Sequence, residues 1–299
     1  MKKKPFSFLA KRNTENSIYF NISGTANLNS EVEYQNENLK FLFSPNYLFF
    51  QDTILDIIAN KSSSSILKFG DGDYFFLKGI SEGSAKPGKR ALSIDYENFD
   101  LSPFKDGWNV IDHFACEISL INRNRFYELA PNRIPSFPAE YLYASVANHW
   151  FTSSLGVEIA VIGADLKVNL IEELQKNDDY LNYIGAKSPM KTITIPQKYA
   201  CDDIEKTIKE TLAQVEKSGA RVFLVGVGHA KSALLPALAQ NYPGVFIDIG
   251  SGIDALAGVI DIYRPYFGDW TNFQFSDRDY YEGIDFLQVK SFGEIKYLY

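Results

Sequence analysis

The chain has 299 residues, 45% of them hydrophobic, and a formal net charge of −7 at pH 7. This length supplies one large α/β domain or two small ones with an ordinary buried core. The acidic balance argues against wholesale nucleic-acid binding, because phosphate backbones are bound by basic surfaces, although it leaves a local basic patch open. No apolar run reaches the roughly 18 residues of a membrane span, so we expect no transmembrane segment.

The cysteines and histidines exclude two further classes of protein. Cys116 and Cys201 lie in unrelated contexts, so neither a disulfide framework nor a CxxC metal motif is expected. The three histidines, His113, His149 and His229, fall in separate segments without the spacing of a zinc site. The composition therefore predicts a cytoplasmic protein that is not a zinc enzyme.

The two ends of the chain differ in amino-acid composition from its centre. Residues 1–50 are rich in Asn and Glu, with short β-like pieces such as Ser17–Ile22, and are predicted to be an N-terminal extension. Its start, Met1–Lys4, is followed by an apolar stretch too short for a signal peptide, which predicts a solvated tail, with peripheral membrane contact as the alternative. Residues 263–299 are rich in aromatic residues and are predicted to be a C-terminal tail packed on the domain.

The predicted elements begin near Asp52, which is a candidate N-cap for a first helix. A short strand, Ile66–Phe69, follows a Ser-rich loop. Apolar residues at helical spacing then predict helices over Trp108–Ile121 and Ala139–Leu155.

Strands and helices alternate regularly in the second half of the chain. The predicted elements are strand Val157–Gly163, a helix from Asp165, strand Thr192–Ile195, helix Asp202–Lys217, strand Val222–Val225, helix Ala230–Gln240 and strand Val245–Ile249. This alternation implies βαβ crossovers. We therefore predict an α/β, Rossmann-like domain over residues 51–262, with a mostly parallel sheet and helices on both faces.

The first candidate site is the segment Gly70–Asp73, which places Asp71 and Asp73 two residues apart after a strand. On an extended backbone both carboxylates would point to the same side, and Mg²⁺ or Mn²⁺ binds such oxygens together with substrate phosphates. Asp-Gly between apolar runs equally predicts a hairpin turn. A haloacid-dehalogenase-type phosphatase is a poor match, because Phe75 stands where that family places Thr or Val.

The second candidate site is the glycine-rich turn from Gly226 to Lys231. A strand that runs through such a turn into a helix presents free backbone N–H groups to a phosphate or carboxylate. The turn departs from the Rossmann GxGxxG at Lys231 and from the P-loop at Ala230, and a plain turn with a solvated Lys231 is the alternative. His229 is a candidate general base or a residue that hydrogen-bonds at the helix start.

Two further segments complete the candidate site. Asp248 lies at the carboxyl end of strand Val245–Ile249, where open α/β sheets bind ribose hydroxyls. Asp254 follows as a helix-capping or site carboxylate. Lys89 and Arg90, in a basic loop, could neutralise a diphosphate, although such loops are more often simply solvated.

These segments resemble the signature of the GT-D glycosyltransferases, a bacterial family formerly known as a domain of unknown function. Phe69–Asp73 is similar to the family's FGDGE motif, Gly226–Lys231 to its GPxAK turn, and Ile247–Gly250 to its DIG strand end. The three blocks occur in the family's order. Asp73 replaces the family's Glu, and Ser251 stands where many members have His.

The resemblance implies a Rossmann-like domain that binds a UDP-sugar together with Mn²⁺ or Mg²⁺ at Asp71 and Asp73. Members often build glycans on bacterial surface proteins or polysaccharides. The catalytic candidates are Asp71, Asp73, His229 and Asp254. The residues expected at the donor are Phe69, Gly70, Gly72, Lys89, Arg90, Gly226, Gly228, Lys231, Asp248 and Ser251.

The predicted function is metal-assisted transfer of a sugar from a nucleoside diphosphate sugar, expected to be UDP-linked, to a hydroxyl of a glycan or glycoprotein. One alternative is a methyltransferase or dehydrogenase that binds S-adenosylmethionine or NAD through Gly226, Gly228 and Asp248 and needs no metal. Another is a sugar- or nucleotide-binding module without catalytic activity.

Overall fold

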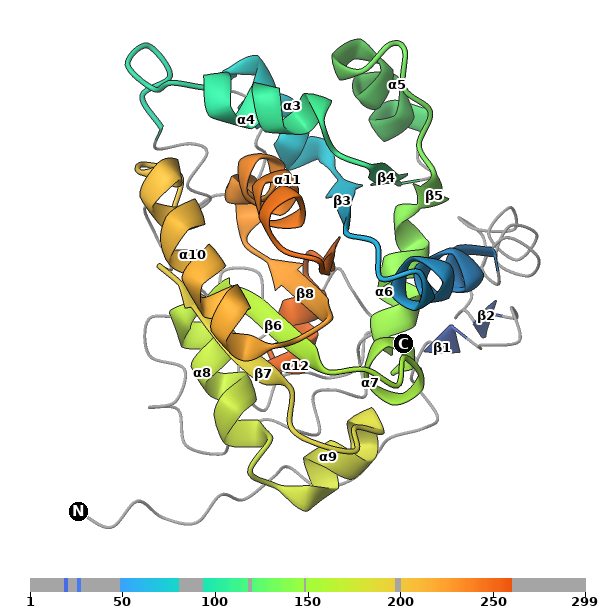
Figure 1. Cartoon of the computed structure of the whole chain (residues 1–299). Coiled ribbons are helices and arrows are strands. Elements are labelled where there is room, and N and C mark those ends of the chain that lie inside the picture. Colours follow the sequence, from blue (N-terminus) through green and yellow to red (C-terminus); the bar gives the residue numbers. More distant parts are fainter. Residues whose placement is uncertain are drawn as a thin grey trace, which may run out of the picture.

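A seven-stranded parallel sheet forms the centre of the computed structural model (Figure 1). The structure describes residues 19–20, 26–27, 49–80, 94–117, 120–147, 149–196 and 200–259. In sheet order the strands are β5 (Phe137–Pro138), β4 (His113–Cys116), β3 (Ser64–Phe69), β9 (Val245–Asp248), β8 (Val222–Gly226), β6 (Ile159–Ala164) and β7 (Lys191–Ile195). The short strands β1 (Tyr19–Phe20) and β2 (Ala26–Asn27) pair separately and antiparallel.

The parallel register places apolar residues in rows across the sheet. Ile66 of β3 pairs with Ile247 of β9, Ile247 with Leu224 of β8, and Leu224 with Val161 of β6. All four side chains are buried in one core. The next row, which includes Leu67, faces the opposite core, because successive strand side chains point to opposite faces. Both faces of the sheet are therefore covered.

The helices form two layers around this sheet. One layer comprises α3 (Asp71–Lys78), α4 (Ser102–Asn109), α5 (Leu120–Leu129), α10 (Ile204–Ser218) and α11 (Lys231–Asn241). The other comprises helical residues 49–59, α6 (Ala139–Ala147), α7 (Trp150–Ser154), α8 (Asp165–Leu174), α9 (Asp178–Ile184) and α12 (Gly252–Leu256). The predicted Rossmann-like α/β class is confirmed.

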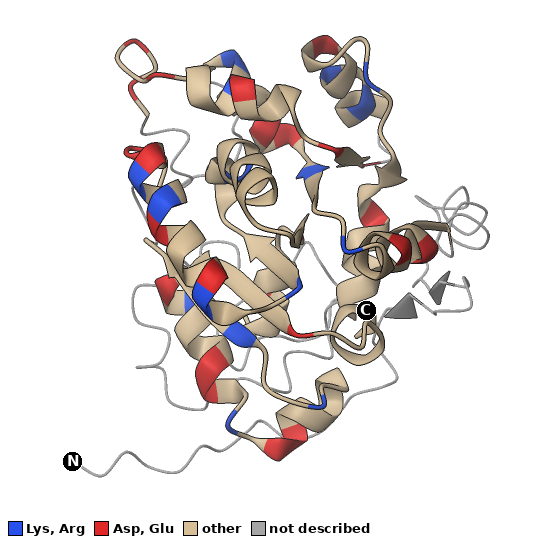
Figure 2. Cartoon of the chain, in the orientation of Figure 1, with Lys and Arg blue, Asp and Glu red and all other residues tan. Residues whose placement is uncertain are grey.

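Acidic and basic residues alternate along some of these helices, as in α10, whose apolar and threonine residues Ile204, Thr207, Thr211 and Val215 are buried (Figure 2). In the part of the chain that the structure describes, no helix is both long and apolar enough to cross a membrane. The predicted extension and tail lie largely outside the described residues, and their boundaries stay predictions.

Three predictions for the first half of the chain were wrong. The segment predicted as helix Trp108–Ile121 contains the end of α4, strand β4 and the start of α5. Its central residues have a helical pattern, but pairing with β3 draws them into the sheet. Helix Ala139–Leu155 is interrupted at His149, whose φ is 60°, and Asp52 lies inside helical residues 49–59. The strands predicted from Ile66 onward all form, with ends shifted by at most a few residues.

Candidate functional site

A cavity of about 300 Å³ lies at the carboxyl edge of the sheet, where β3, β8 and β9 end. From β3 the chain runs outward to β4, whereas from β6 it runs outward to β7 on the other side. Ligands of open α/β sheets bind at such a change of direction. The cavity is lined by Lys68, Gly70, Asp71, Gly72, Asp73, Glu117, Tyr143, Lys167, Gly226, Gly228, His229, Lys231, Asp248, Gly250, Ser251, Ile253 and Asp254. Residues from all three sequence motifs therefore meet in one place.

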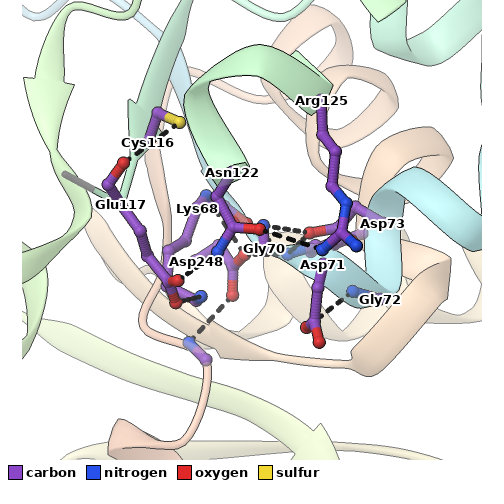
Figure 3. Close-up of polar contacts among 12 residues, drawn as sticks. Lys68, Gly70, Asp71, Gly72, Asp73, Cys116, Glu117, Asn122, Arg125 and Asp248 are labelled. Carbon is purple, nitrogen blue, oxygen red and sulfur yellow. Dashed lines mark hydrogen bonds and ion pairs between the residues drawn. The ribbon is translucent and has the colours of Figure 1, made fainter. Parts of the chain in front are cut away.

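The two aspartates of the first motif lie on a helix, so the expected extended backbone and the alternative hairpin are both wrong. Helix α3 begins at Asp71 directly after Gly70, which ends the strand segment in an extended conformation. Residues two apart on a helix point about 200° from each other. The Asp71 carboxylate is exposed and accepts a hydrogen bond from Gly72 N at 2.8 Å. The Asp73 carboxylate is buried and accepts one from Gly70 N at 2.8 Å (Figure 3).

A buried amine connects the first motif to the other two. Lys231 Nζ lies 2.9 Å from Asp73 Oδ2 and 2.7 Å from Asp248 Oδ2, and it also donates to the carbonyl oxygen of Lys68. The Lys231 side chain is 8% exposed, so the alternative of a solvated lysine is wrong. Burial lowers the pKa of Lys231, but the carboxylates of Asp248 and Asp73 outweigh burial and leave this pKa raised.

Asp248 has both carboxylate oxygens engaged within the protein. Oδ2 accepts from Lys231 Nζ and, at 3.1 Å, from Lys68 N; Oδ1 accepts from Gly250 N at 2.9 Å. The residue is 1% exposed. Its carboxylate therefore holds the ends of β3 and β9 together beneath the cavity, a role different from the expected contact with ribose hydroxyls. We call Asp73, Lys231 and Asp248 the floor of the pocket.

The rim of the pocket, which we define as Asp71, Glu117, Lys167 and Asp254, is more exposed. Glu117 follows β4 directly; its Oε1 lies 3.5 Å from Lys68 Nζ, and its Oε2 accepts a hydrogen bond from Asn122 at 2.5 Å (Figure 3). Lys167, in the first turn of α8, forms an ion pair with Asp254 of α12. The Glu117, Lys167 and Asp254 side chains are 23–24% exposed, so water reaches them.

Glycines let the backbone of the second and third motifs approach the cavity. Gly228 has a φ of 59°, which favours glycine, and a Cβ there would meet no atom of the residues that the structure describes within 4 Å. Gly250 has a φ of 52°, and a Cβ there would lie 2.9 Å from Lys68 Cε. At Gly226 a Cβ would lie 2.5 Å from Ile253 Cγ2. Side chains at Gly226 and Gly250 would therefore disturb the packing around the cavity.

His229 lies on the same side of the pocket as α3. Its ring stacks on Phe76 of that helix, with centroids 4.6 Å apart and planes 9° apart, and its Cε1 would lie 3.4 Å from a Cβ at Gly72. The imidazole is half-buried and lines the cavity. This position suits the predicted base or helix-start role.

One predicted donor-site residue does not line the pocket, and two others cannot be placed. Phe69 is fully buried in the core, with its ring 5.7 Å from Trp108 and 5.5 Å from Phe126. Lys89 and Arg90 lie outside the described residues. Ser251 lines the cavity, and none of the described residues hydrogen-bonds to its buried hydroxyl oxygen.

Sequence reasoning missed several pocket residues, chiefly Lys68, Glu117, Tyr143, Lys167 and Ile253. Glu117 was missed because β4 was assigned to a helix; a strand there would have placed it at the carboxyl edge. Lys167 follows β6 by three residues, so its position after a strand was the available signal. Tyr143 comes from α6, and its ring lies 5.3 Å from Lys68 Nζ, a contact that no local pattern indicates.

The lining residues fit a divalent metal ion in part. Asp71 offers an exposed carboxylate at the cavity, whereas the Oδ2 of Asp73 already accepts from Lys231 and Gly70. Among the described residues, no group of three or more His, Cys, Asp or Glu side chains is placed to hold a metal. Asp71 therefore fits the ligand role with its exposed carboxylate, whereas the Oδ2 of Asp73 is already occupied.

The fold and pocket define a Rossmann-like α/β protein with a polar ligand site at the carboxyl edge of its parallel sheet. Comparisons with protein-family models, with curated proteins and with solved structures found no match. The resemblance to the GT-D glycosyltransferases therefore rests on the sequence motifs alone and stays a prediction.

Proposed function

We propose that this chain is a glycosyltransferase that binds a nucleoside diphosphate sugar, UDP-linked by resemblance, in the pocket and transfers the sugar to a hydroxyl of a glycan or glycoprotein. The observation that carries the proposal is the convergence of Asp71, the Gly226–Lys231 turn and the Asp248–Asp254 segment on one cavity. These three motifs lie far apart in the sequence, and a shared ligand explains why each carries glycines and polar residues at a strand end.

The pocket offers backbone and side-chain groups for both halves of such a donor. The turn at Gly228 exposes main chain to the cavity just before α11, where N–H groups and the positive end of the helix suit a phosphate. The rim offers carboxylates and a lysine that suit the hydroxyls of a sugar. Tyr143 adds an aromatic ring at the wall.

The charges of the pocket favour a cation at the diphosphate. Its lining includes five carboxylates, on Asp71, Glu117, Asp254 and the two floor aspartates, against three lysine amines. All three of these lysine amines already form ion pairs with carboxylates of the protein. They therefore neutralise little of the negative charge of a diphosphate. Mn²⁺ or Mg²⁺ held by Asp71 and phosphate oxygens would neutralise the leaving group.

The transfer step forms a bond between the acceptor oxygen and the anomeric carbon and breaks the bond from that carbon to the diphosphate oxygen. The acceptor hydroxyl loses its proton to a base, and the nucleoside diphosphate leaves with the electron pair. Glu117, Asp254 and His229 all line the cavity and are the candidate bases. Asp254 is paired with Lys167 and Glu117 with Lys68, so pairing does not separate these two carboxylates as candidates.

The methyltransferase and dehydrogenase alternative is less well supported by the floor of the pocket. It needs a free carboxylate at the strand end to bind ribose hydroxyls. Asp248 is that carboxylate, and both of its oxygens are engaged by Lys231, Lys68 and Gly250. A sugar- or nucleotide-binding module without catalytic activity could have the same pocket geometry. Measurement of donor turnover distinguishes it from a glycosyltransferase.

A ligand screen tests the proposal and its alternatives together. Thermal unfolding is followed with UDP-, GDP- and CDP-sugars, NAD and S-adenosylmethionine, each with and without Mn²⁺. We expect a metal-dependent rise in the unfolding midpoint with one nucleotide sugar, and slow hydrolysis of that donor in the absence of acceptor. A metal-independent rise with NAD or S-adenosylmethionine would overturn the proposal, and binding without any turnover would favour the module.

The variant D71N sharpens this test, because Asp71 is exposed at the cavity and its loss leaves the floor intact. We expect D71N to weaken metal-dependent donor binding at least about tenfold, or ~1.4 kcal/mol, and to abolish donor hydrolysis. The matched control is D56N, which neutralises an exposed aspartate in helical residues 49–59, outside the pocket lining. Unchanged turnover in D71N would contradict the site assignment.

A further inference from the structure

We propose that Lys231 is the resident cation of the pocket floor and that Asp73 and Asp248 hold its amine in the place that the sequence motif suggests for a metal ion. The inference concerns the protein itself and does not depend on which ligand the pocket binds. It assigns a positioning role to Lys231 and removes Asp73 from the set of metal ligands.

The surroundings of the Lys231 amine carry this inference. An ammonium group has three N–H donors, and this one has three acceptors: Asp73 Oδ2, Asp248 Oδ2 and the Lys68 carbonyl oxygen. The lysine is buried, and so are both aspartates. A buried charge persists only when it is paired and hydrogen-bonded, and this arrangement meets both conditions.

The same oxygens cannot serve the amine and a metal at once. Asp73 Oδ2 and Asp248 Oδ2 both lie within 3 Å of Lys231 Nζ. Mg²⁺ binds oxygen at about 2.1 Å and brings two positive charges, so an ion bound between these carboxylates would occupy the amine's position. With Lys231 present, a divalent ion is therefore excluded from the position between these two oxygens, whereas the exposed carboxylate of Asp71 stays open to it.

Lys231 also positions the three motifs relative to one another. It begins α11 after the glycine-rich turn, and its amine reaches the first turn of α3 through Asp73, the end of β9 through Asp248 and β3 through the Lys68 carbonyl. Asp73 in turn accepts from Gly70 N, the residue before Asp71. The turn before Asp71 is thus linked through Asp73 to an amine that belongs to another motif.

The first experiment titrates Mn²⁺ alone into the wild type, D71N and D73N and follows binding by the loss of the free-ion signal in electron paramagnetic resonance. We expect D73N to change the Mn²⁺ affinity by less than about threefold. A tenfold change would correspond to about 1.4 kcal/mol of binding free energy. If the wild type alone binds no Mn²⁺ measurably, the same three proteins are titrated with inorganic diphosphate present, and the same comparison of D71N with D73N applies. A loss of tenfold or more in D73N, with retained folding, would overturn the proposal.

The second experiment removes the amine. In K231A, Asp73 and Asp248 face each other without a cation, so we expect Mn²⁺ or Mg²⁺ to raise the unfolding midpoint by several degrees more than in the wild type. This gain should vanish in the double variant K231A/D73N and should be absent in K206A, which removes an exposed lysine from α10. If Lys231 had only a structural role, K231A would lower the unfolding midpoint, and metal ions would not raise it more than in the wild type.

Each outcome of the second experiment decides something. A folded K231A without any metal-dependent gain would overturn the assignment of Lys231 as a cation in the metal's place. If K231A fails to fold, as circular dichroism would show, the D73N titration decides alone. Failure of the glycosyltransferase proposal is separate, because it is read from nucleotide-sugar binding and turnover rather than from metal binding to the protein.

Discussion

The floor and the rim of the pocket are built from the same residue types and behave in opposite ways. On the floor, Asp73, Lys231 and Asp248 are buried and bound to one another. On the rim, Asp71 is exposed, and the Lys167–Asp254 pair is partly open to water. The contrast separates carboxylates that hold the protein together from carboxylates that are available to a ligand.

The neighbours Asp71 and Asp73 show the contrast most directly. They are two residues apart in one motif, yet the helix that starts at Asp71 leaves one carboxylate exposed at the cavity and brings the other to Lys231. A pair of acidic residues in a sequence therefore does not imply a pair of metal ligands, because the backbone conformation decides where each carboxylate points.

The largest difference between floor and rim is expected in stability. K231M removes the amine and leaves two buried carboxylates without their cation, so we expect a loss of about 3–5 kcal/mol in the free energy of unfolding. K167M removes the partner of Asp254 on the rim, where water screens the charge, and should change it by less than about 1 kcal/mol. Urea unfolding measures the free energy of unfolding of both variants. Similar losses in K231M and K167M would contradict the distinction between floor and rim.

A smaller difference is expected between two glycines of the same motifs. In G226A the new Cβ would lie 2.5 Å from Ile253 Cγ2, so we expect overpacking to cost about 1–3 kcal/mol. In G72A the Cβ would meet His229 Cε1 at an ordinary 3.4 Å, and a helical Gly-to-Ala change should stabilise by up to about 1 kcal/mol.

The double variant G226A/I253A is the control for this steric explanation. Truncating Ile253 makes room for the new methyl group, so the two substitutions together should destabilise by less than the sum of their separate effects. Urea unfolding of the four proteins measures the coupling. Strict additivity would mean that G226A acts through something other than contact with Ile253.

The smallest effect is expected at Cys116, the residue before Glu117 of the rim. Burial, with a contribution from the Glu117 carboxylate, raises the pKa of the Cys116 thiol to about 12. At pH 8 only about 10⁻⁴ of such a thiol is the reactive thiolate. In a C201S variant we expect a thiol reagent to label the native protein at least about 100-fold more slowly than the urea-unfolded chain. Comparable rates would show that this strand end opens readily.

Local sequence patterns were sufficient for the strands in the second half of the fold. Strands such as Val222–Gly226 are short apolar runs between glycine-rich turns and amphipathic helices, and each such signal agrees with the parallel sheet that forms. Strand β4 escaped prediction, because His113–Cys116 is short and its place next to β3 is set by residues distant in sequence. A helical period in a window of this size does not exclude pairing in a sheet.

The motifs of the site were recognisable from residue types and their positions after strands, and parallel strands necessarily bring such positions to one edge. The role of each residue in these motifs could not be predicted, because it depends on contacts between residues as far apart in the sequence as Lys68 and Lys231. Burial and hydrogen bonding turn Asp73 and Asp248 into partners of a lysine and leave Asp71 for the ligand. The sequence determines the chemical type of each side chain, whereas the packing of the strands and helices determines which charged groups pair with one another.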